Sequence, residues 1–229
     1  MGLRTLVVIP AYNEALNIEK TVTDIKENAA NVDYIIINDG SKDNTLEVIA
    51  KNQYNYIDGF CNLGLFGAVQ TGFKLALKYN YDIVIQFDGD GQHSAKYISE
   101  MVKEIESGND IVIGSRFVSE KKPYTARMIG SRLIALAIKI MTSVTITDPT
   151  SGFRAYGKSC IKEYATEMNN PPEPDTLVYM LRKKRKIKEI QVTMQDREFG
   201  ESYLNLGNTI KYMSRMLVSI FLIQPFRKV

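Results

Sequence analysis

The chain has 229 residues, of which 45% are hydrophobic and 24% charged, so it can bury the core of one large domain or two small ones. Its 29 Lys and Arg against 26 Asp and Glu leave a net charge of +3, which is too small to indicate a nucleic-acid-binding protein. Cys61 and Cys160 are isolated, which argues against a disulfide framework or a zinc site and favours a reduced, cytoplasmic location.

The first half of the chain alternates between two kinds of pattern. Continuous apolar runs rich in β-branched residues predict strands buried on both faces at Leu6–Ile9, Asp33–Asn38, Ile83–Phe87 and Asp110–Gly114. Apolar residues at helical spacing predict helices between them, at about residues 13–25, 44–51, 65–79 and 97–106. This alternation predicts an α/β fold with a mostly parallel sheet flanked by helices.

The second half carries longer apolar faces. Helices are expected over Arg127–Val144 and Leu177–Arg185 and from Leu204 onwards. A turn motif at Asp148–Arg154 is followed by a short strand, and another strand is expected at Ile187–Val192. Residues 169–174 include three prolines and predict a loop.

Polar residues follow four of the predicted strands. In a parallel α/β sheet, ligands bind outside the carboxyl ends of the strands. Those ends read Pro10-Ala11-Tyr12-Asn13-Glu14, Asn38-Asp39-Gly40-Ser41, Asp88-Gly89-Asp90-Gly91-Gln92 and Gly114-Ser115-Arg116. A core needs none of these groups, and burying unpaired carboxylates is costly, so a polar ligand site is expected at this edge.

Asp88, Asp90 and Gln92 are the residues best suited to hold a metal. Carboxylate and amide oxygens suit a hard divalent cation such as Mg²⁺ or Mn²⁺, which commonly also holds substrate phosphates. An isolated Asp-x-Asp is equally typical of a surface turn. The polar groups on the neighbouring strand ends favour the metal site over that turn.

Six motifs follow one another in order along the chain. They are Val8–Glu14, Asn38–Ser41, Asn62–Gly64, Asp88–His93, Gly114–Arg116 and Asp148–Arg154. Together they resemble the family 2 glycosyltransferases of the dolichol-phosphate mannosyltransferase type and their bacterial polyprenyl-phosphate relatives. The resemblance covers about residues 5–203 and implies a GT-A (Rossmann-like) domain over residues 1–203. The apolar pattern of the tail predicts a C-terminal amphipathic helix over residues 204–229.

The resemblance also implies a reaction and a donor site. The reaction is inverting transfer of a hexose from a nucleotide-sugar to a polyprenyl phosphate. The residues matching the donor pocket are Pro10, Tyr12, Glu14, Asp39 and Asp88, with Arg197 and Ser202 in a segment that closes over the diphosphate. Asp88, Asp90 and Gln92 match the metal contacts, and His93 is expected to support their loop. The chain departs from the family pattern at Asn38, commonly an acid, and at Tyr203, commonly a lysine.

Arg116, Arg127 and Ser131 match residues that hold the acceptor phosphate in this family. Arg127 and Ser131 are four residues apart and therefore share one side of a helix. An arginine fork and a hydroxyl suit a phosphate monoester, whose second pKa of about 6 leaves it largely ionised without a strong base. Asp90, through its cation, and the two arginines would then act by electrostatics and positioning.

A lipid acceptor requires contact with a membrane. No run of about 18 apolar residues occurs, and no signal peptide is expected. Residues 208–226 combine Lys211 and Arg215 with a nearly continuous apolar run, which predicts an interfacial helix or a dock for a small membrane partner protein. The expected location is the inner face of the cell membrane, where basic residues 182–188 would favour anionic lipid.

Three alternatives stay open or are set aside. A same-fold transferase acting on a hydroxyl of a lipid-linked saccharide or glycan would need a base, for which Glu173 and Asp175 are the candidates. A non-catalytic nucleotide-binding protein is a second alternative. A dehydrogenase is disfavoured because the first strand is not followed by GxGxxG. UDP-glucose is the favoured donor, with UDP-N-acetylhexosamine and GDP-mannose open.

Overall fold

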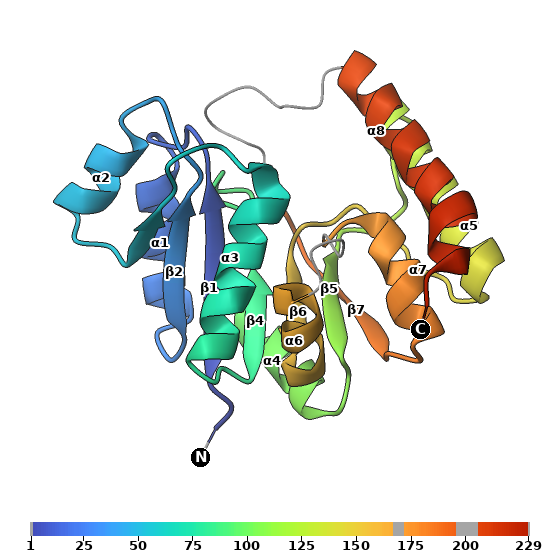
Figure 1. The fold of residues 1–229 in the computed structure, drawn as a ribbon, viewed down its shortest axis with the longest axis horizontal. Coiled ribbons are helices and arrows are strands. Elements are labelled where there is room, and N and C mark those ends of the chain that lie inside the picture. Colours follow the sequence, from blue (N-terminus) through green and yellow to red (C-terminus); the bar gives the residue numbers. More distant parts are fainter. Residues whose placement is uncertain (1, 167–171, 196–205, 229) are drawn as a thin grey trace.

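The computed structural model describes residues 2–166, 172–195 and 206–228, and for residues 126, 127 and 206–208 it describes the backbone only. Within these ranges, seven strands form one sheet in the order β3-β2-β1-β4-β6-β5-β7 (Figure 1). The strands are β1 (Thr5–Ala11), β2 (Asp33–Asn38), β3 (Tyr56–Asp58), β4 (Ile83–Gln86), β5 (Ile111–Ser115), β6 (Arg154–Gly157) and β7 (Ile187–Gln191). Only β6 runs antiparallel to its neighbours, β4 and β5, so the predicted mostly parallel sheet is confirmed.

Helices cover both faces of the sheet because its central strands are apolar on both sides (Figure 1). The helices are α1 (Ile18–Asn28), α2 (Thr45–Lys51), α3 (Gly64–Lys78), α4 (Ile98–Glu106), α5 (Ala126–Thr142), α6 (Lys158–Thr166), α7 (Pro174–Arg182) and α8 (Leu206–Val218). In β1, Leu6 and Val8 join the core beneath α3, α5 and α6, whereas Val7 and Ile9 join the core beneath α1 and α4. This alternation is the period of two that a strand imposes on its side chains.

Two elements were not predicted from the sequence. β3 has only three residues at the edge of the sheet, too few to show a period. α6 follows β6 directly and buries Cys160, Ile161 and Tyr164 against α3 and the sheet. In addition, α7 begins at Pro174, earlier than expected, because proline is well tolerated in the first turn of a helix.

The C-terminal helix packs on the rest of the molecule through α5 and α7. Met216 and Ile220 are buried in the same core as α5, so the apolar run of the tail is divided between the core and the surface. The carboxylate of Asp175 accepts hydrogen bonds from Ser219 Oγ (2.5 Å) and Gln224 Nε2 (3.0 Å). Among the helices described, none is both long enough and apolar enough to cross a membrane.

Candidate active site

The loops after β1 and β2 are joined to each other at the carboxyl edge of the sheet. The Asn13 side chain accepts a hydrogen bond from Lys42 N (2.8 Å), and Asn13 N donates to Ser41 Oγ (3.0 Å). The next residue, Glu14, is held in the same way, because its backbone N donates to Thr45 Oγ1 (2.9 Å). Pro10 is buried at the end of β1 and Tyr12 is partly exposed, so the expected nucleotide pocket has an ordered wall.

Asp39 connects three of the motifs. Its backbone N donates to Ala11 O (2.9 Å), and its carboxylate accepts from Leu63 N (2.8 Å) in the Asn62–Gly64 motif. The departure from the family pattern at Asn38 also has a physical reason. The Asn38 amide donates to Asp58 Oδ1 (2.7 Å), so an acid at this position would place two carboxylates against each other.

Asp88 is contacted by two polar side chains. Gln86 Nε2 donates to Asp88 Oδ1 (3.2 Å), and His93 Nε2 lies 3.3 Å from Oδ2. Burial raises the pKa of Asp88, whereas the contacts with His93 and Gln86 and the charge of Arg154 lower it, and the net shift is downward. The His93 ring stacks on Phe153, with 4.9 Å between centroids, and this contact orients it towards Asp88.

Asp90 and Gln92 are presented by a tight turn. Gly91 adopts a φ of 74°, and Asp90 Oδ1 accepts from Gln92 N (3.1 Å). Gln92 Nε2 donates to Gln195 O (3.2 Å), which leaves Oε1 as the acceptor atom of this amide.

By ligand type, this donor set would suit Mg²⁺ or Mn²⁺. In the described part of the chain, no three His, Cys, Asp or Glu residues gather as a closed metal site. Asp88, Asp90 and Gln92 would supply only two carboxylates and one amide oxygen. Such an incomplete set suits a cation that keeps positions for water and substrate phosphate oxygens.

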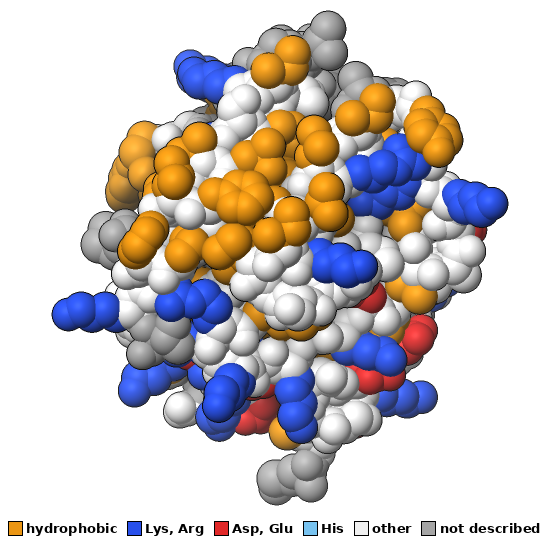
Figure 2. Space-filling view, turned by 90° about the vertical axis from the view of Figure 1, so that its right-hand side faces the viewer, with side chains coloured by type: hydrophobic (Ala, Val, Ile, Leu, Met, Phe, Trp, Pro, Cys, Tyr) orange, Lys and Arg blue, Asp and Glu red, His pale blue; other side chains and the backbone are white. Residues whose placement is uncertain are grey.

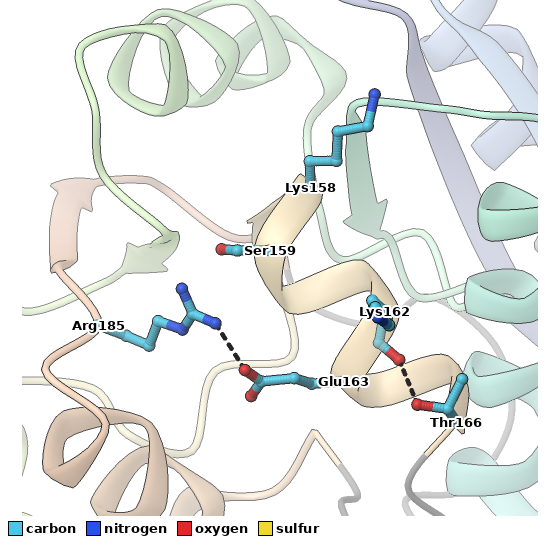
Figure 3. A pocket seen from close by; sticks show the side chains of 6 residues that line it. All are labelled: Lys158, Ser159, Lys162, Glu163, Thr166 and Arg185. Carbon is cyan, nitrogen blue, oxygen red and sulfur yellow. Dashed lines mark hydrogen bonds and ion pairs between the residues drawn. The ribbon is translucent and has the colours of Figure 1, made fainter.

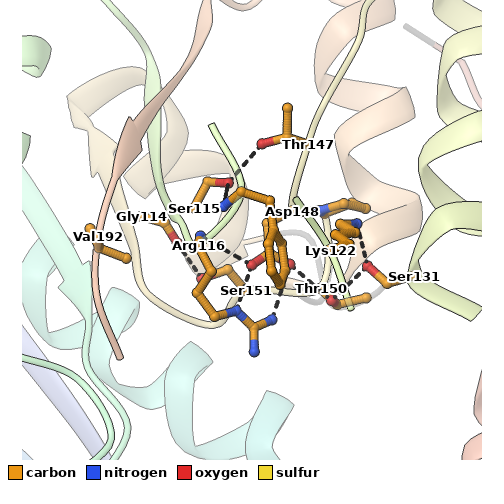
Figure 4. Close-up of polar contacts among 12 residues, drawn as sticks. Gly114, Ser115, Arg116, Lys122, Ser131, Thr147, Asp148, Thr150, Ser151 and Val192 are labelled. Atoms are coloured by element: carbon orange, nitrogen blue, oxygen red, sulfur yellow. Dashed lines mark hydrogen bonds and ion pairs between the residues drawn. The ribbon is translucent and has the colours of Figure 1, made fainter. Parts of the chain in front are cut away.

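Arg116, after β5, forms a two-pronged ion pair with the fully buried Asp148 (Figure 4). Its Nε donates to Asp148 Oδ2 at 2.8 Å and its Nη2 to Oδ1 at 3.2 Å. A guanidinium has five N–H donors, so this pair fixes the plane of the group and leaves further donors for a ligand.

Ser131, on α5, is buried between two partners (Figure 4). Lys122 Nζ donates to Ser131 Oγ (2.9 Å), and Thr150 Oγ1 lies 3.2 Å from the same oxygen. Thr150 Oγ1 donates in turn to Asp148 Oδ1 (3.1 Å). Arg116 and Ser131, both predicted to bind the acceptor phosphate, therefore belong to one hydrogen-bonded cluster.

The Asp148–Arg154 motif joins this cluster to the Asp88 loop. Arg154 is fully buried, and its guanidinium donates to the carbonyl oxygens of Pro149 (2.6 Å), Ser151 (2.8 Å) and Pro172 (3.2 Å). A Cβ atom on Gly152 would lie 2.7 Å from Asp88 Oδ2, so the motif passes directly against that carboxylate. The expected donor and acceptor groups are therefore neighbours in space.

The remaining predicted site residues are outside what the structure describes. The side chain of Arg127 and both residues of the closing segment, Arg197 and Ser202, fall in this group. Conversely, two polar residues were missed by the sequence analysis. They are Lys122, in a charged loop without a motif, and Glu189, on β7, which accepts from Thr147 N (2.6 Å) and Asp148 N (2.8 Å).

A polar pocket lies at the opposite edge of the sheet (Figure 3). It has a volume of about 450 Å³ and is lined by Lys158, Ser159, Lys162, Glu163, Thr166 and Arg185. β6 runs antiparallel to β4, so the carboxyl end of β6 lies at the edge of the sheet where β4 begins. α6 starts at this edge, and its Lys158 forms an ion pair with Asp82, just before β4. The groups of this pocket take no part in the carboxyl-edge site.

Comparison with known proteins identifies the family. The family model for glycosyl transferase family 2 matches residues 6–165, which is most of the chain. The chain belongs to glycosyl transferase family 2. It is accordingly an enzyme that transfers a sugar, and the resemblance inferred from the six motifs is confirmed.

Relatives within the family share most of the chain. An undecaprenyl-phosphate mannosyltransferase of Micrococcus luteus is 27% identical, over 90% of this chain and 89% of the relative. A UDP-N-acetylglucosamine–dolichyl-phosphate N-acetylglucosaminyltransferase of Methanococcus voltae is 30% identical, over 71% of this chain and 72% of the relative.

A solved structure shares the fold. Glucosyl-3-phosphoglycerate synthase of Mycobacterium tuberculosis, crystallised with Mn²⁺, UDP and phosphoglyceric acid, superposes with a TM-score of 0.71 at 18% identity. The match covers 100% of this chain and 80% of the synthase. At this identity the likeness shows the GT-A-like fold alone.

Proposed function

We propose that this glycosyltransferase moves a hexose from a nucleotide-sugar to a polyprenyl phosphate, for cell-surface glycan synthesis, in a metal-dependent and inverting reaction. The observation that carries the proposal is the polar cluster of Arg116, Asp148, Thr150 and Ser131 directly beside the Asp88 loop. An arginine with buried hydroxyls suits a phosphate monoester. The two relatives described above, which differ in sugar, both carry a polyprenyl-type phosphate in their names.

The mechanism follows from charge and position. A phosphate monoester with a second pKa of about 6 is already ionised near neutral pH and can attack the anomeric carbon without a base. Arg116, with Arg127 and Ser131, would hold this phosphate in line with the bond that breaks. The attack occurs opposite to the departing nucleoside diphosphate and therefore inverts the anomeric centre.

The donor side would be formed by the loops after β1, β2 and β4. Pro10, Tyr12, Glu14 and Asp39 would contact the nucleoside, and Arg197 with Ser202 the diphosphate. Asp88, Asp90 and Gln92 would hold Mg²⁺ or Mn²⁺. Such a cation, when bound, neutralises charge on the leaving diphosphate. UDP-glucose is the proposed donor, with UDP-N-acetylhexosamine and GDP-mannose as the alternatives to compare.

A donor panel tests this function. Purified protein is mixed with farnesyl phosphate, Mg²⁺ or Mn²⁺ and each of the three nucleotide-sugars, and products are identified by mass. We expect a glycosyl-phosphate product with one donor, no product with farnesol, and loss of product in EDTA that added metal restores. Transfer to farnesol would contradict the phosphate acceptor. Transfer that persists in EDTA would contradict the metal assignment.

Glu173 and Asp175, the candidate bases of the hydroxyl-acceptor alternative, make contacts with the C-terminal segment. Asp175 is buried and bound to Ser219 and Gln224, and Glu173 Oε1 forms an ion pair with Arg215 Nη2 (2.6 Å). Glu173 therefore attaches α8 through Arg215, and Asp175 attaches the segment that follows α8. We expect Asp175→Asn to keep transfer within about threefold, because an amide still accepts these hydrogen bonds, whereas loss of a catalytic base costs about a hundredfold or more.

Asp175→Val provides the matched comparison. It should lower the free energy of unfolding by about 2 kcal/mol, measured in urea, because it leaves buried polar groups unpaired. If Asp175→Asn is as stable as the wild type but inactive, the base assignment is correct instead.

The same lipid acceptor predicts a membrane-facing surface. Figure 2 shows hydrophobic side chains gathered on the face that carries α5 and the C-terminal helix, with Lys and Arg at its margin. The exposed apolar residues of these elements are Ile129, Leu133, Leu136, Ile140, Ile210, Val218, Phe221, Leu222, Ile223 and Phe226. Neither residues 126–142 nor residues 206–228 contain Asp or Glu. We propose that this face lies on anionic lipid at the inner side of the cell membrane.

Liposome flotation tests this surface without disturbing the core. The triple variant Leu222→Ser, Ile223→Ser, Phe226→Ser changes side chains that are 65%, 56% and 82% exposed. We expect it to lose most binding to anionic liposomes, at about 25 cal/mol per Å² of apolar area withdrawn from water. A control with Leu3→Ser and Leu16→Ser, exposed elsewhere, should float like the wild type. No binding by the wild type would point to a small membrane partner protein instead.

A further inference from the structure

Lys122 is a cation beside the acceptor cluster to which the proposed function assigns no role. It lies in the loop between β5 and α5, and its half-buried side chain reaches Ser131 (Figure 4). Its ammonium nitrogen is 5.3 Å from the centre of the Phe117 ring, and the Arg116 guanidinium carbon is 5.1 Å from the same centre. One aromatic ring therefore brings both cations to the same place.

The loop around Lys122 is fixed by hydrogen bonds from Arg132 to its backbone carbonyl oxygens. Arg132 donates from Nη2 to Lys122 O (2.5 Å) and from Nη1 to Pro123 O (3.2 Å). The Arg132 guanidinium also stacks over the Tyr124 ring at 4.5 Å. Because these contacts fix the backbone, the ammonium group is presented in a defined position before any ligand arrives.

The hydrogen bonds of the cluster have a direction. Thr150 donates its proton to Asp148, so it accepts from Ser131, and Ser131 accepts from Lys122. The chain of donors thus runs from the ammonium of Lys122 to the carboxylate of Asp148. An ammonium has three N–H donors, and this chain uses one of them.

Counted with Lys122 itself, the charged groups around its ammonium are three positive and two negative. Arg116, Lys122 and Arg132 stand against Asp148 and Glu189, whose carboxylates already hold backbone N–H groups and hydroxyls. Burial lowers the pKa of Lys122, and Arg116 and Arg132 lower it further, against the opposing effect of the two carboxylates. Among the described residues, its hydrogen-bonding partner is the neutral Ser131 hydroxyl, so an added anion would be stabilised here.

We propose that Lys122 binds the phosphate group of the acceptor beside Arg116, while the Ser131 hydroxyl, which accepts from Lys122, holds the ammonium in position. This inference rests on the proposed function and adds a residue that none of the six motifs contains. A phosphate dianion offers three oxygens, and a lysine meets them as a compact point charge beside the planar arginine fork. Lys122 therefore favours binding of a charged acceptor, since an alcohol carries no negative charge that a second cation could stabilise.

The test measures acceptor binding directly. Farnesyl phosphate is titrated into the wild type, Lys122→Met, Lys122→Gln, Lys122→Arg and Lys121→Met without donor, and binding is followed by phosphorus NMR and calorimetry. Lys121 is the matched control, because it is the adjacent lysine and is exposed. We expect about tenfold or greater loss of affinity in Lys122→Met and Lys122→Gln, partial retention in Lys122→Arg, and no change in Lys121→Met.

The remaining outcomes separate the two proposals. If the wild type binds farnesyl phosphate but Lys122→Met and Lys122→Gln bind it equally well, the Lys122 assignment is wrong and the proposed function stands. If the wild type binds farnesol as tightly as farnesyl phosphate, the phosphate-acceptor function and the Lys122 assignment both fall. Binding of the nucleotide donor, measured in parallel, should be equal in all five proteins, and equal melting temperatures show that the variants are folded.

Discussion

Asp90→Asn should reduce the rate of sugar transfer by about a hundredfold or more, because it removes a charge that would hold the divalent cation against the leaving diphosphate. The substitution keeps the shape of the side chain and an oxygen that can accept from Gln92 N, as Asp90 Oδ1 does at 3.1 Å. The turn should therefore persist, with Gly91 still at a positive φ. The loss should then appear in kcat and in the concentration of metal needed for half-maximal activity.

The control for this variant is Asp33→Asn. Asp33 begins β2 and lies at the opposite edge of the sheet, where its exposed carboxylate accepts from Tyr81 Oη (2.8 Å). It should transfer sugar like the wild type. Near-normal transfer by Asp90→Asn, with an unchanged requirement for Mg²⁺ or Mn²⁺, would remove Asp90 from the metal site.

Arg154→Met should lower both stability and activity. The substitution leaves the carbonyl oxygens of Pro149, Ser151 and Pro172 without the donor that now satisfies them. Each unsatisfied buried acceptor costs about 1–3 kcal/mol, and the sum is partly offset because a charge no longer has to be buried. We expect a net loss of about 3 kcal/mol, which corresponds to a melting temperature lower by roughly 10 °C.

The loss of activity has a separate cause. The loop that Arg154 holds carries Thr150 into the acceptor cluster and Gly152 against Asp88. Activity measured well below the melting temperature should therefore fall as well. Arg4→Met is the matched control, because Arg4 is 55% exposed in its pair with Asp33 and should change stability by less than about 1 kcal/mol. A stable but inactive Arg154→Met would show that the carbonyl contacts are not what stabilises this loop.

Much of the fold could be read from local patterns. The runs at Leu6–Ile9 and Asp33–Asn38 predicted strands because a strand buried on both faces needs a continuous apolar sequence. β3 and α6 were missed because three residues show no period and because the polar start of α6 resembles a loop. The boundaries of α7 moved because Pro174 begins a helix as readily as it ends a loop.

The candidate site also has a part that the sequence predicted and a part that only the structure shows. Asp88, Asp90 and Gln92 are close in sequence, and their spacing, together with the polar groups on the neighbouring strand ends, predicted a shared role in binding a cation. The sequence offered Glu173 and Asp175 as candidate bases without indicating their partners. Arg215, Ser219 and Gln224, which bind them, lie at least forty residues further along the chain, as separations of 42, 44 and 49 show.

The sequence by itself determined the family, the α/β architecture and the edge of the sheet at which the motif residues gather, because motifs and hydrophobic periods are local properties. Only the tertiary structure decided that β6 enters between β4 and β5 in the antiparallel direction. That insertion places the Asp148–Arg154 motif between Asp88 and Arg116, and packing of α5 places Ser131 against Lys122. Contacts of this kind depend on how distant segments pack, which no local pattern records.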